Sequence, residues 1–429
     1  MCRRWCGNGR YGLWAGLVGC ALVLGGWVPV WAQEQGPPPA GTFDGSFRCS
    51  RAAQAALPAL TVKALHEDAS VSSAAIAEMR KFGPLAVQHL LGDVELQKSP
   101  RWSSVLDAVA QQKDAKYSGL FWHTDLSTAL AEARYSKKPV LSLRLLGQLT
   151  DELSCANSRY FRTTLYPNQQ VKALLSQEFV LHWQTVRAVP IITIDFGDGR
   201  KIQRTITGNS LHLILDDQGR SIDVLPGLYA AEPFVNELRS TSAAARKLAE
   251  FQGAEFVSQR ARMHATRLQE VSHDWEQRCA VAQTPGLAIG INHPDEVWAR
   301  VVNVPNAPAV LDETARRAVL EHLAPAERAG RLALAKSIAE TPQMAMIRNL
   351  SRVISEDSAR NEYYFHAQIH SWFSLPVVLP EGDALVARVY ADLFLSPLDD
   401  PWYGLSRPDI YSAIKQDGRL DAVTQNSGD

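Results

Sequence analysis

Apolar residues recur at three- and four-residue spacing through the first part of the chain. The segments AAQAALPALTVKAL, SSAAIAEMRKFGPLAVQHLLG and SPRWSSVLDAVAQQ each carry this pattern. Such spacing is typical of amphipathic helices, and the proline and glycine residues between the apolar runs mark helix ends. We therefore expect a small helical N-terminal module over residues 47–118.

The pattern changes near residue 119. Asp125 is a suitable N-cap for the helix LSTALAEARYS, and KKPVLSLRLLG then has the continuous apolar character of a buried strand. A helix, NQQVKALLSQ, and a strand, EFVLHWQTV, follow. IITIDFGDGRKIQRTI and LHLILDDQGRSIDVLPG each predict a β-hairpin, and EPFVNELRSTSAAARKLAEF returns to helix. Strands enclosed by helices predict an α/β domain with a central mixed sheet over residues 119–245.

The remaining part of the chain, residues 246–429, again has mostly helical spacing. Its longest helical segments are FVSQRARMHATRLQEVSHDWEQRC and EDSARNEYYFHAQIHSWF, and no repeat period links them. The sequence therefore predicts an α/β domain embedded between mostly α-helical N- and C-terminal regions.

The first 32 residues have the features of a secretory signal. Arginines precede a glycine-rich apolar run, and the small residues of VWA end at Ala32. An alternative is a lipid anchor on Cys20, which follows the lipobox-like Leu-Val-Gly. Residues 33–46 are a Pro/Gly-rich linker. We expect an exported protein of the periplasm or cell envelope, with no membrane span after cleavage of the signal.

Charge and composition restrict the partners. The net charge is −1, and loss of the signal arginines makes it more negative. This predicts no surface for nucleic acid or other polyanions. No phosphate-binding glycine loop, serine triad signature or haem motif is present, so we expect no cofactor. We expect the chain to bind one or more protein partners. The sequence does not decide whether it is an enzyme.

Three cysteines follow the signal: Cys49, Cys155 and Cys279. An odd number in an oxidising compartment allows one disulfide and one free thiol, with three pairings. Cys49 and Cys279 flank the region that contains Cys155, which favours pairing those two. A bridge from Cys155 to Cys49 or to Cys279 remains open.

Residues 119–245 carry a resemblance to a known family. Trp122, LSTALAEARYSKKPVLSL, a helix opened by Cys155, EFVLHW and LHLILDDQGRSIDVLPG resemble exported bacterial thioredoxin-like domain proteins of uncharacterised function. The resemblance implies a thioredoxin fold whose site lies at the start of the Cys155 helix. It covers under a third of the chain.

The motif that carries the family's chemistry is degenerate here. Disulfide oxidoreductases place C-x-x-C at a helix start, where the first thiolate is the nucleophile and the second cysteine resolves the mixed disulfide. In this sequence Cys155 takes the second position and Glu152 replaces the nucleophile. The resemblance therefore implies an exported thioredoxin-fold protein without the dithiol, with a binding or assembly role.

An alternative function is a monothiol disulfide oxidoreductase or isomerase that uses Cys155. Arg159, one turn later, would favour its thiolate, whereas Glu152 would oppose it. The family's cis-proline position corresponds to Gly208-Asn209-Ser210-Leu211, which has no proline, so we expect a trans bond there. Asn209 or Ser210 could instead offer polar contacts to Cys155.

A second candidate constellation is Glu362, His366 and His370 in NEYYFHAQIH. Spacing of i, i+4 and i+8 places all three on one stripe of a helix, where two histidines and a carboxylate can bind a metal ion. The simpler interpretation is histidines at the edge of a packed helix that hydrogen-bond to neighbours. No H-E-x-x-H is present, so a zinc protease is not predicted. A metal-binding protein is the third and weaker functional hypothesis.

Overall fold

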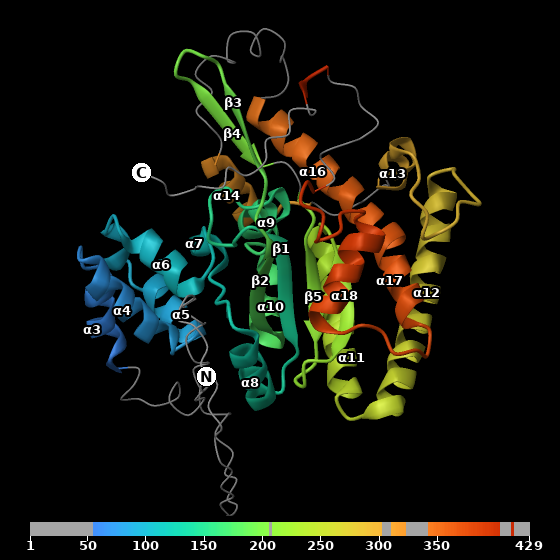
Figure 1. The fold of residues 1–429 in the computed structure, drawn as a ribbon, viewed down its shortest axis with the longest axis horizontal. Coiled ribbons are helices and arrows are strands. Elements are labelled where there is room, and N and C mark those ends of the chain that lie inside the picture. Colours follow the sequence, from blue (N-terminus) through green and yellow to red (C-terminus); the bar gives the residue numbers. More distant parts are fainter. Residues whose placement is uncertain (1–54, 206–207, 303–309, 323–341, 404–412, 416–429) are drawn as a thin grey trace, which may run out of the picture.

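The computed structural model describes residues 55–205, 208–302, 310–322, 342–403 and 413–415. The expected signal (1–32), the linker (33–46), the anchor position Cys20 and the disulfide candidate Cys49 lie outside these residues. Within them the architecture is mixed α/β, as the sequence predicts (Figure 1).

The N-terminal module consists of short helices with a core of its own. These are α3 (Leu57–Ala64), α4 (Ala69–Arg80), α5 (Pro84–Gly92), η2 (Leu96–Lys98), α6 (Trp102–Ala110) and α7 (Ala115–Ser118). Met79, Leu90 and Leu106 are fully buried among them. Arg80 joins the module to the α/β domain, because it donates hydrogen bonds to the carbonyl oxygens of Val109 (2.7 Å) and Trp122 (3.1 Å).

A four-stranded mixed sheet forms the centre of the molecule. Its order is β2 (Val180–Arg187), β1 (Val140–Leu146), β5 (Leu211–Leu215), β6 (Ser221–Pro226). β1 runs parallel to β2 and antiparallel to β5, and β6 is antiparallel to β5. Every residue of β1 is buried, which explains its continuous apolar sequence. The strand predictions and the β5–β6 hairpin are confirmed.

Helices connect and cover these strands. α8 (Leu126–Ser136) is capped by Asp125, which accepts a hydrogen bond from the backbone N–H of Thr128 at 2.7 Å, as predicted. α9 (Ala156–Tyr160), the π-helix η3 (Phe161–Leu165) and α10 (Gln169–Glu178) lead from β1 to β2, and α11 (Ala231–Leu248) follows β6.

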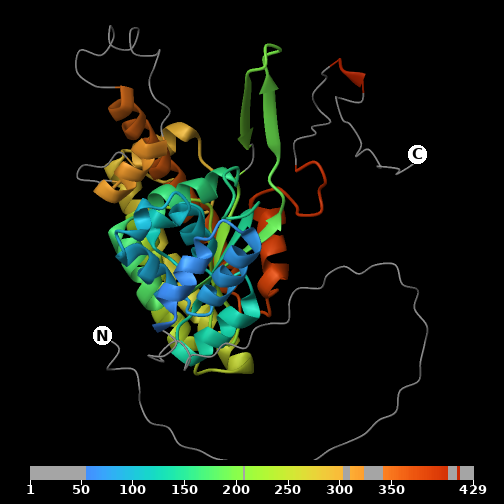
Figure 2. The ribbon, with the colours of Figure 1, turned by 90° about the vertical axis from the view of Figure 1, so that its left-hand side faces the viewer.

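The predicted IITIDFGDGRKIQRTI hairpin is also confirmed. β3 (Ile191–Asp195) and β4 (Lys201–Thr205) form a separate two-stranded sheet in which Ile194 pairs with Ile202. The hairpin projects away from the body of the molecule, and almost all of its residues are exposed (Figure 2).

The C-terminal helices pack onto the sheet. They are α12 (Gly253–Val281), α13 (Asp295–Val302), α14 (Glu313–His322), α16 (Pro342–Arg360), the π-helix η4 (Asn361–His366), α17 (Ala367–Phe373), α18 (Gly382–Arg388) and η5 (Val389–Leu393). One apolar core contains Leu213 and Phe234 together with Ile369 and Val389. α12 and α17 lie side by side beyond β6 (Figure 1). Among the described helices, none combines the length and apolarity needed to cross a membrane.

Candidate metal centre

A cluster of buried polar side chains lies where β6, the last strand of the sheet, meets the C-terminal helices. An edge strand leaves backbone groups that need partners. Here the carbonyl oxygen of Ile222 accepts a hydrogen bond from His264 Nε2 of α12 at 2.8 Å. The N–H of Val224 donates to Asp223 Oδ1 at 2.7 Å. The edge is therefore closed by side chains that belong to the cluster.

His366 and His370 lie together, as the spacing of the sequence predicts. His366 ends the π-helix η4 and His370 lies in α17, with ring centroids 4.0 Å apart and both side chains buried. His366 Nε2 lies 3.1 and 3.2 Å from the two carboxylate oxygens of Asp223. π-Turns inside helices are frequent at functional sites.

The hydrogen bonds of His264 determine the tautomer of His370. His264 must donate from Nε2, because the Ile222 carbonyl can only accept. Its Nδ1 therefore accepts from His370 Nδ1, 2.8 Å away. Burial lowers the pKa of His264 to about 4 and that of His370 well below its usual value, so both rings are neutral. His370 Nε2 thus carries a lone pair, and no described residue hydrogen-bonds to it.

His366 is oriented by a carboxylate. Its Nε2 donates to Asp223, which leaves Nδ1 without a hydrogen-bond partner among the described residues. Burial opposes a charge on His366, but the Asp223 carboxylate raises the pKa of His366 overall. Burial likewise opposes ionisation of Asp223, but His366 holds the pKa of that carboxyl far below its usual range.

Glu237 of α11 is the third possible metal ligand beside His366 and His370. One of its oxygens pairs with Arg267 of α12, and the other, Oε2, is buried without a described partner. Glu237, His366 and His370 each offer one ligand atom, and these atoms lie within 4.8 Å of one another. We call these three residues the Glu237 site. Two imidazole nitrogens and one carboxylate oxygen form a donor set found in zinc and non-haem iron proteins.

Each residue of the Glu237 site is hydrogen-bonded to a further side chain. Arg267 pairs with Glu237, Asp223 with His366, and His264 with His370. Metal ligands in proteins are commonly oriented by such outer hydrogen bonds, which select the tautomer and the direction of the lone pair. Here one ligand atom of each residue, Glu237 Oε2, His366 Nδ1 and His370 Nε2, is left without a hydrogen-bond partner among the described residues.

Asp223, His264 and His370 form a second group whose ligand atoms lie within 4.8 Å of one another. In this group, however, the facing Nδ1 atoms of His264 and His370 already share a hydrogen bond. Asp223 is likewise occupied by His366, by Val224 and by Thr241 Oγ1 at 3.3 Å. An ion there would have to replace existing bonds, so the Glu237 site is the better candidate.

Glu362, the carboxylate that the sequence pattern selects, belongs to neither group. It lies one turn before His366 in η4, where burial raises its pKa to about 7, helped by the nearby charge of Glu237 and opposed by Arg278. Sequence reasoning missed Glu237, Asp223 and His264. A signal for the first two exists, because each is a polar residue on an otherwise apolar core-facing position, in FVNEL and SIDVL.

The Cys155 region contrasts with this cluster. Cys155 caps α9: its Sγ accepts from the N–H of Ser158 at 3.4 Å and lies 2.8 Å from Ser158 Oγ. The side chain is fully buried, and the thiol is free. Cys279 is also a free, buried thiol, so these two cysteines do not bridge each other. The favoured pairing of Cys49 with Cys279, and the pairing of Cys49 with Cys155, stay untested because Cys49 lies outside the described part of the chain.

The supporting residues expected around Cys155 bind elsewhere. Glu152 is 69% exposed and lies 3.5 Å from Lys113 Nζ. Arg159 donates to Thr205 Oγ1 at 2.7 Å and to a backbone oxygen. The backbone oxygen of Asn209 accepts from a tyrosine hydroxyl.

Ser210 Oγ is buried without a hydrogen-bond partner among the described residues. The peptide bonds in the described part of the chain are trans, which includes the Ser210 position. The hydrogen bonds of the expected supporting residues thus do not converge on the sulfur, whose own bonds go to Ser158.

No protein-family model, curated protein or solved structure matches this chain.

Proposed function

We propose that this protein binds one divalent first-row transition-metal ion at the Glu237 site. The observation that carries the proposal is that Glu237, His366 and His370 bring ligand atoms within 4.8 Å of one another and that each has one buried ligand atom without a partner among the described residues. A buried polar atom without a partner costs about 1–3 kcal/mol, and one ion would satisfy all three. The simpler interpretation, packed histidines that hydrogen-bond to neighbours, accounts for Asp223 and His264 but leaves these three atoms unexplained.

The donor atoms indicate which ions fit. Imidazole nitrogen and carboxylate oxygen suit Zn²⁺, Fe²⁺ and Co²⁺, whereas Cu⁺ prefers thiolate or thioether and Ca²⁺ needs six or more oxygens. Ligand atoms that share an ion at about 2.1 Å lie no more than about 4.2 Å apart. The observed set, within 4.8 Å, therefore needs only small side-chain movements to close around an ion.

The burial of the site favours a binding role for the ion over catalysis on a large substrate. Glu237, His366 and His370 are each less than a twentieth exposed. Glu237 lies in the helix that follows the sheet, and the histidines belong to the C-terminal helices. An ion held between them would join the C-terminal region to the sheet, and its binding free energy would add to the stability of the folded chain.

We further propose that the sheet is a thioredoxin-like scaffold in an exported protein with a binding or assembly role. Support comes from the order β2-β1-β5-β6, with a parallel pair followed by an antiparallel hairpin, and from the Cys155 helix after β1. The buried, hydrogen-bonded thiol lends no support to the monothiol oxidoreductase alternative.

Metal analysis of the purified mature chain tests the proposal. Protein produced in medium supplied with zinc, iron, cobalt and manganese is expected to carry close to one equivalent of a single divalent ion. Glu237→Gln and His366→Gln should lose it. His273→Gln, which changes an exposed histidine of α12, should keep it and serves as the matched control. Protein that neither retains nor takes up any of these ions stoichiometrically would overturn the proposal.

A further inference from the structure

A pocket of about 520 Å³ lies between α13, α14 and α16, away from the Glu237 site. One wall is apolar and includes Val302, Val310 and Leu311. Three guanidinium groups, those of Arg316, Arg348 and Arg352, also line the pocket. The volume is within the range of small-molecule sites, which combine apolar surface with a few directed polar groups.

Among the described residues that line this pocket, three are arginines and one, Glu356, is acidic. Arg352 pairs with Glu356 at 2.8 Å. The side chain of Arg316 makes no hydrogen bond or ion pair with any residue that the structure describes, and its Nε is buried. The hydroxyl of Ser355 donates to the backbone oxygen of Ser351 in its own helix at 3.0 Å and, being uncharged, does not balance the arginines. The part of the lining that the structure describes therefore holds more basic than acidic side chains beside an apolar surface.

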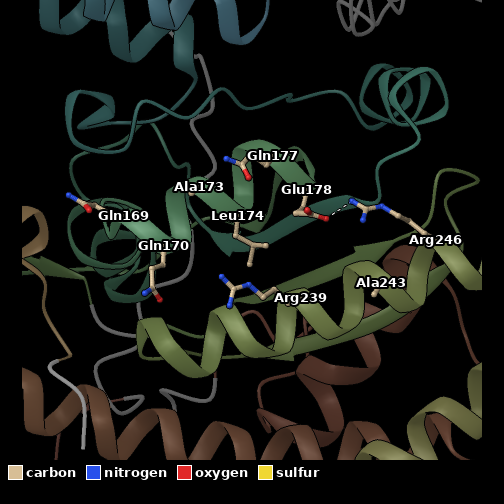
Figure 3. A pocket seen from close by; sticks show the side chains of 9 residues that line it. All are labelled: Gln169, Gln170, Ala173, Leu174, Gln177, Glu178, Arg239, Ala243 and Arg246. Carbon is tan, nitrogen blue, oxygen red and sulfur yellow. Dashed lines mark hydrogen bonds and ion pairs between the residues drawn. The ribbon is translucent and has the colours of Figure 1, made fainter. Parts of the chain in front are cut away.

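The groove between α10 and α11 offers a useful contrast (Figure 3). It has a similar volume, about 480 Å³. Its lining combines glutamine amides such as Gln170 and Gln177 with the guanidinium group of Arg239, and at one end Arg246 is paired with Glu178. Amides both donate and accept, so the glutamines of this lining favour no single class of ligand. The arginine pocket instead combines guanidinium groups, which only donate and stay charged, with the apolar side chains of Val302, Val310 and Leu311.

We propose that the arginine pocket binds an amphiphilic monoanion, a carboxylate attached to an apolar body. Arg316 would bind the carboxylate through its planar pair of N–H groups, and Val302, Val310 and Leu311 would cover the apolar part. The surplus charge excludes cations, and the apolar wall gives no partner to a small inorganic anion. This site is independent of metal binding at the Glu237 site.

Calorimetric titration of the full mature chain tests the proposal with three probes: octanoate, 1-octanol and inorganic phosphate. Octanoate should bind at one site, and the other two should bind about tenfold more weakly or not at all, because each lacks one half of the recognised chemistry. Equal binding of phosphate would mean a simple anion site, and equal binding of octanol a purely apolar one. Either result, or no binding of octanoate, would overturn the proposal.

Variants of α14 locate the binding. Arg316→Gln should weaken octanoate binding about tenfold or more, since a charge-assisted pair of hydrogen bonds is lost. Arg317→Gln removes the same charge from an exposed neighbour and should leave the affinity unchanged. Arg316→Lys keeps the charge without the planar fork and should give an intermediate affinity. Thermal melting checks that all three remain folded, and unchanged binding in a folded Arg316→Gln protein would contradict the assignment.

Discussion

Cys155 and the Glu237 site are both buried, but their polar atoms are satisfied in different ways. The sulfur of Cys155 is bonded within its own helical turn, to Ser158. Glu237, His366 and His370 come from different elements and bring ligand atoms within 4.8 Å of one another, and each has one ligand atom without a partner among the described residues. A local contact gives Cys155 a structural role, whereas the long-range cluster holds the atoms that still need a ligand. The cluster is therefore the proposed metal site, whereas Cys155 caps a helix.

Removing one proposed ligand from the Glu237 site tests the difference between the two regions most directly. His370→Gln should abolish stoichiometric metal binding, because only two ligand atoms of the set then remain. Metal analysis and calorimetric titration of the metal-free protein measure the loss. Cys155→Ser should keep the full metal content, and an equal loss in both variants would remove the distinction between the two regions.

A second test addresses the groups that orient the ligands. Asp223→Asn and His264→Gln should each weaken metal binding about 10–100-fold without abolishing it, as is typical when an outer hydrogen bond to a metal ligand is lost. Competition with a chelator of known affinity measures the change. A loss as complete as that of His370→Gln in either variant would mean that the ion lies instead in the Asp223–His264–His370 group.

The same contrast explains how much the sequence could predict. Asp125 as a cap, both hairpins and β1 follow from patterns within about twenty residues, and the structure confirms them. His366 and His370 are also local, one turn apart. Asp223 and Glu237 come from elements more than a hundred residues earlier, so only tertiary packing places them. Glu362 fits an ideal α-helical stripe, but the chain forms a π-turn there, and the carboxylate grouped with the two histidines is that of Glu237.

Acidification should weaken metal binding. Asp223 raises the pKa of His366, so a proton occupies its Nδ1 up to a higher pH than in an isolated histidine and competes with the ion. Below the raised pKa of His366, the apparent affinity for the metal ion should therefore fall by about tenfold per pH unit for each proton that the ion displaces. Chelator competition between pH 8 and pH 5 measures the slope, and a flat profile would exclude His366 as a ligand.

Glu362 adds a smaller contribution to the pH dependence of metal binding. Its pKa of about 7 means that the metal-free protein holds this carboxyl half protonated near neutrality. A cation nearby favours the ionised form, so metal binding at pH 7 should release a further fraction of a proton. Glu362→Gln should bind the metal and release less acid, measured by titration in buffers of different ionisation enthalpy. Loss of binding in this variant would instead make Glu362 a ligand.

The smallest effects are expected at Cys155. Serine is a good N-cap, so Cys155→Ser should change the free energy of unfolding by no more than about 1 kcal/mol. Cys155→Ala removes the cap acceptor as well and should cost about 1 kcal/mol more, which denaturant unfolding can resolve. Because the thiol is fully buried, a labelling reagent should modify Cys155 only after denaturation. Rapid labelling of the native protein at this residue would restore the monothiol hypothesis, because it would require a thiol that opens to solvent without unfolding.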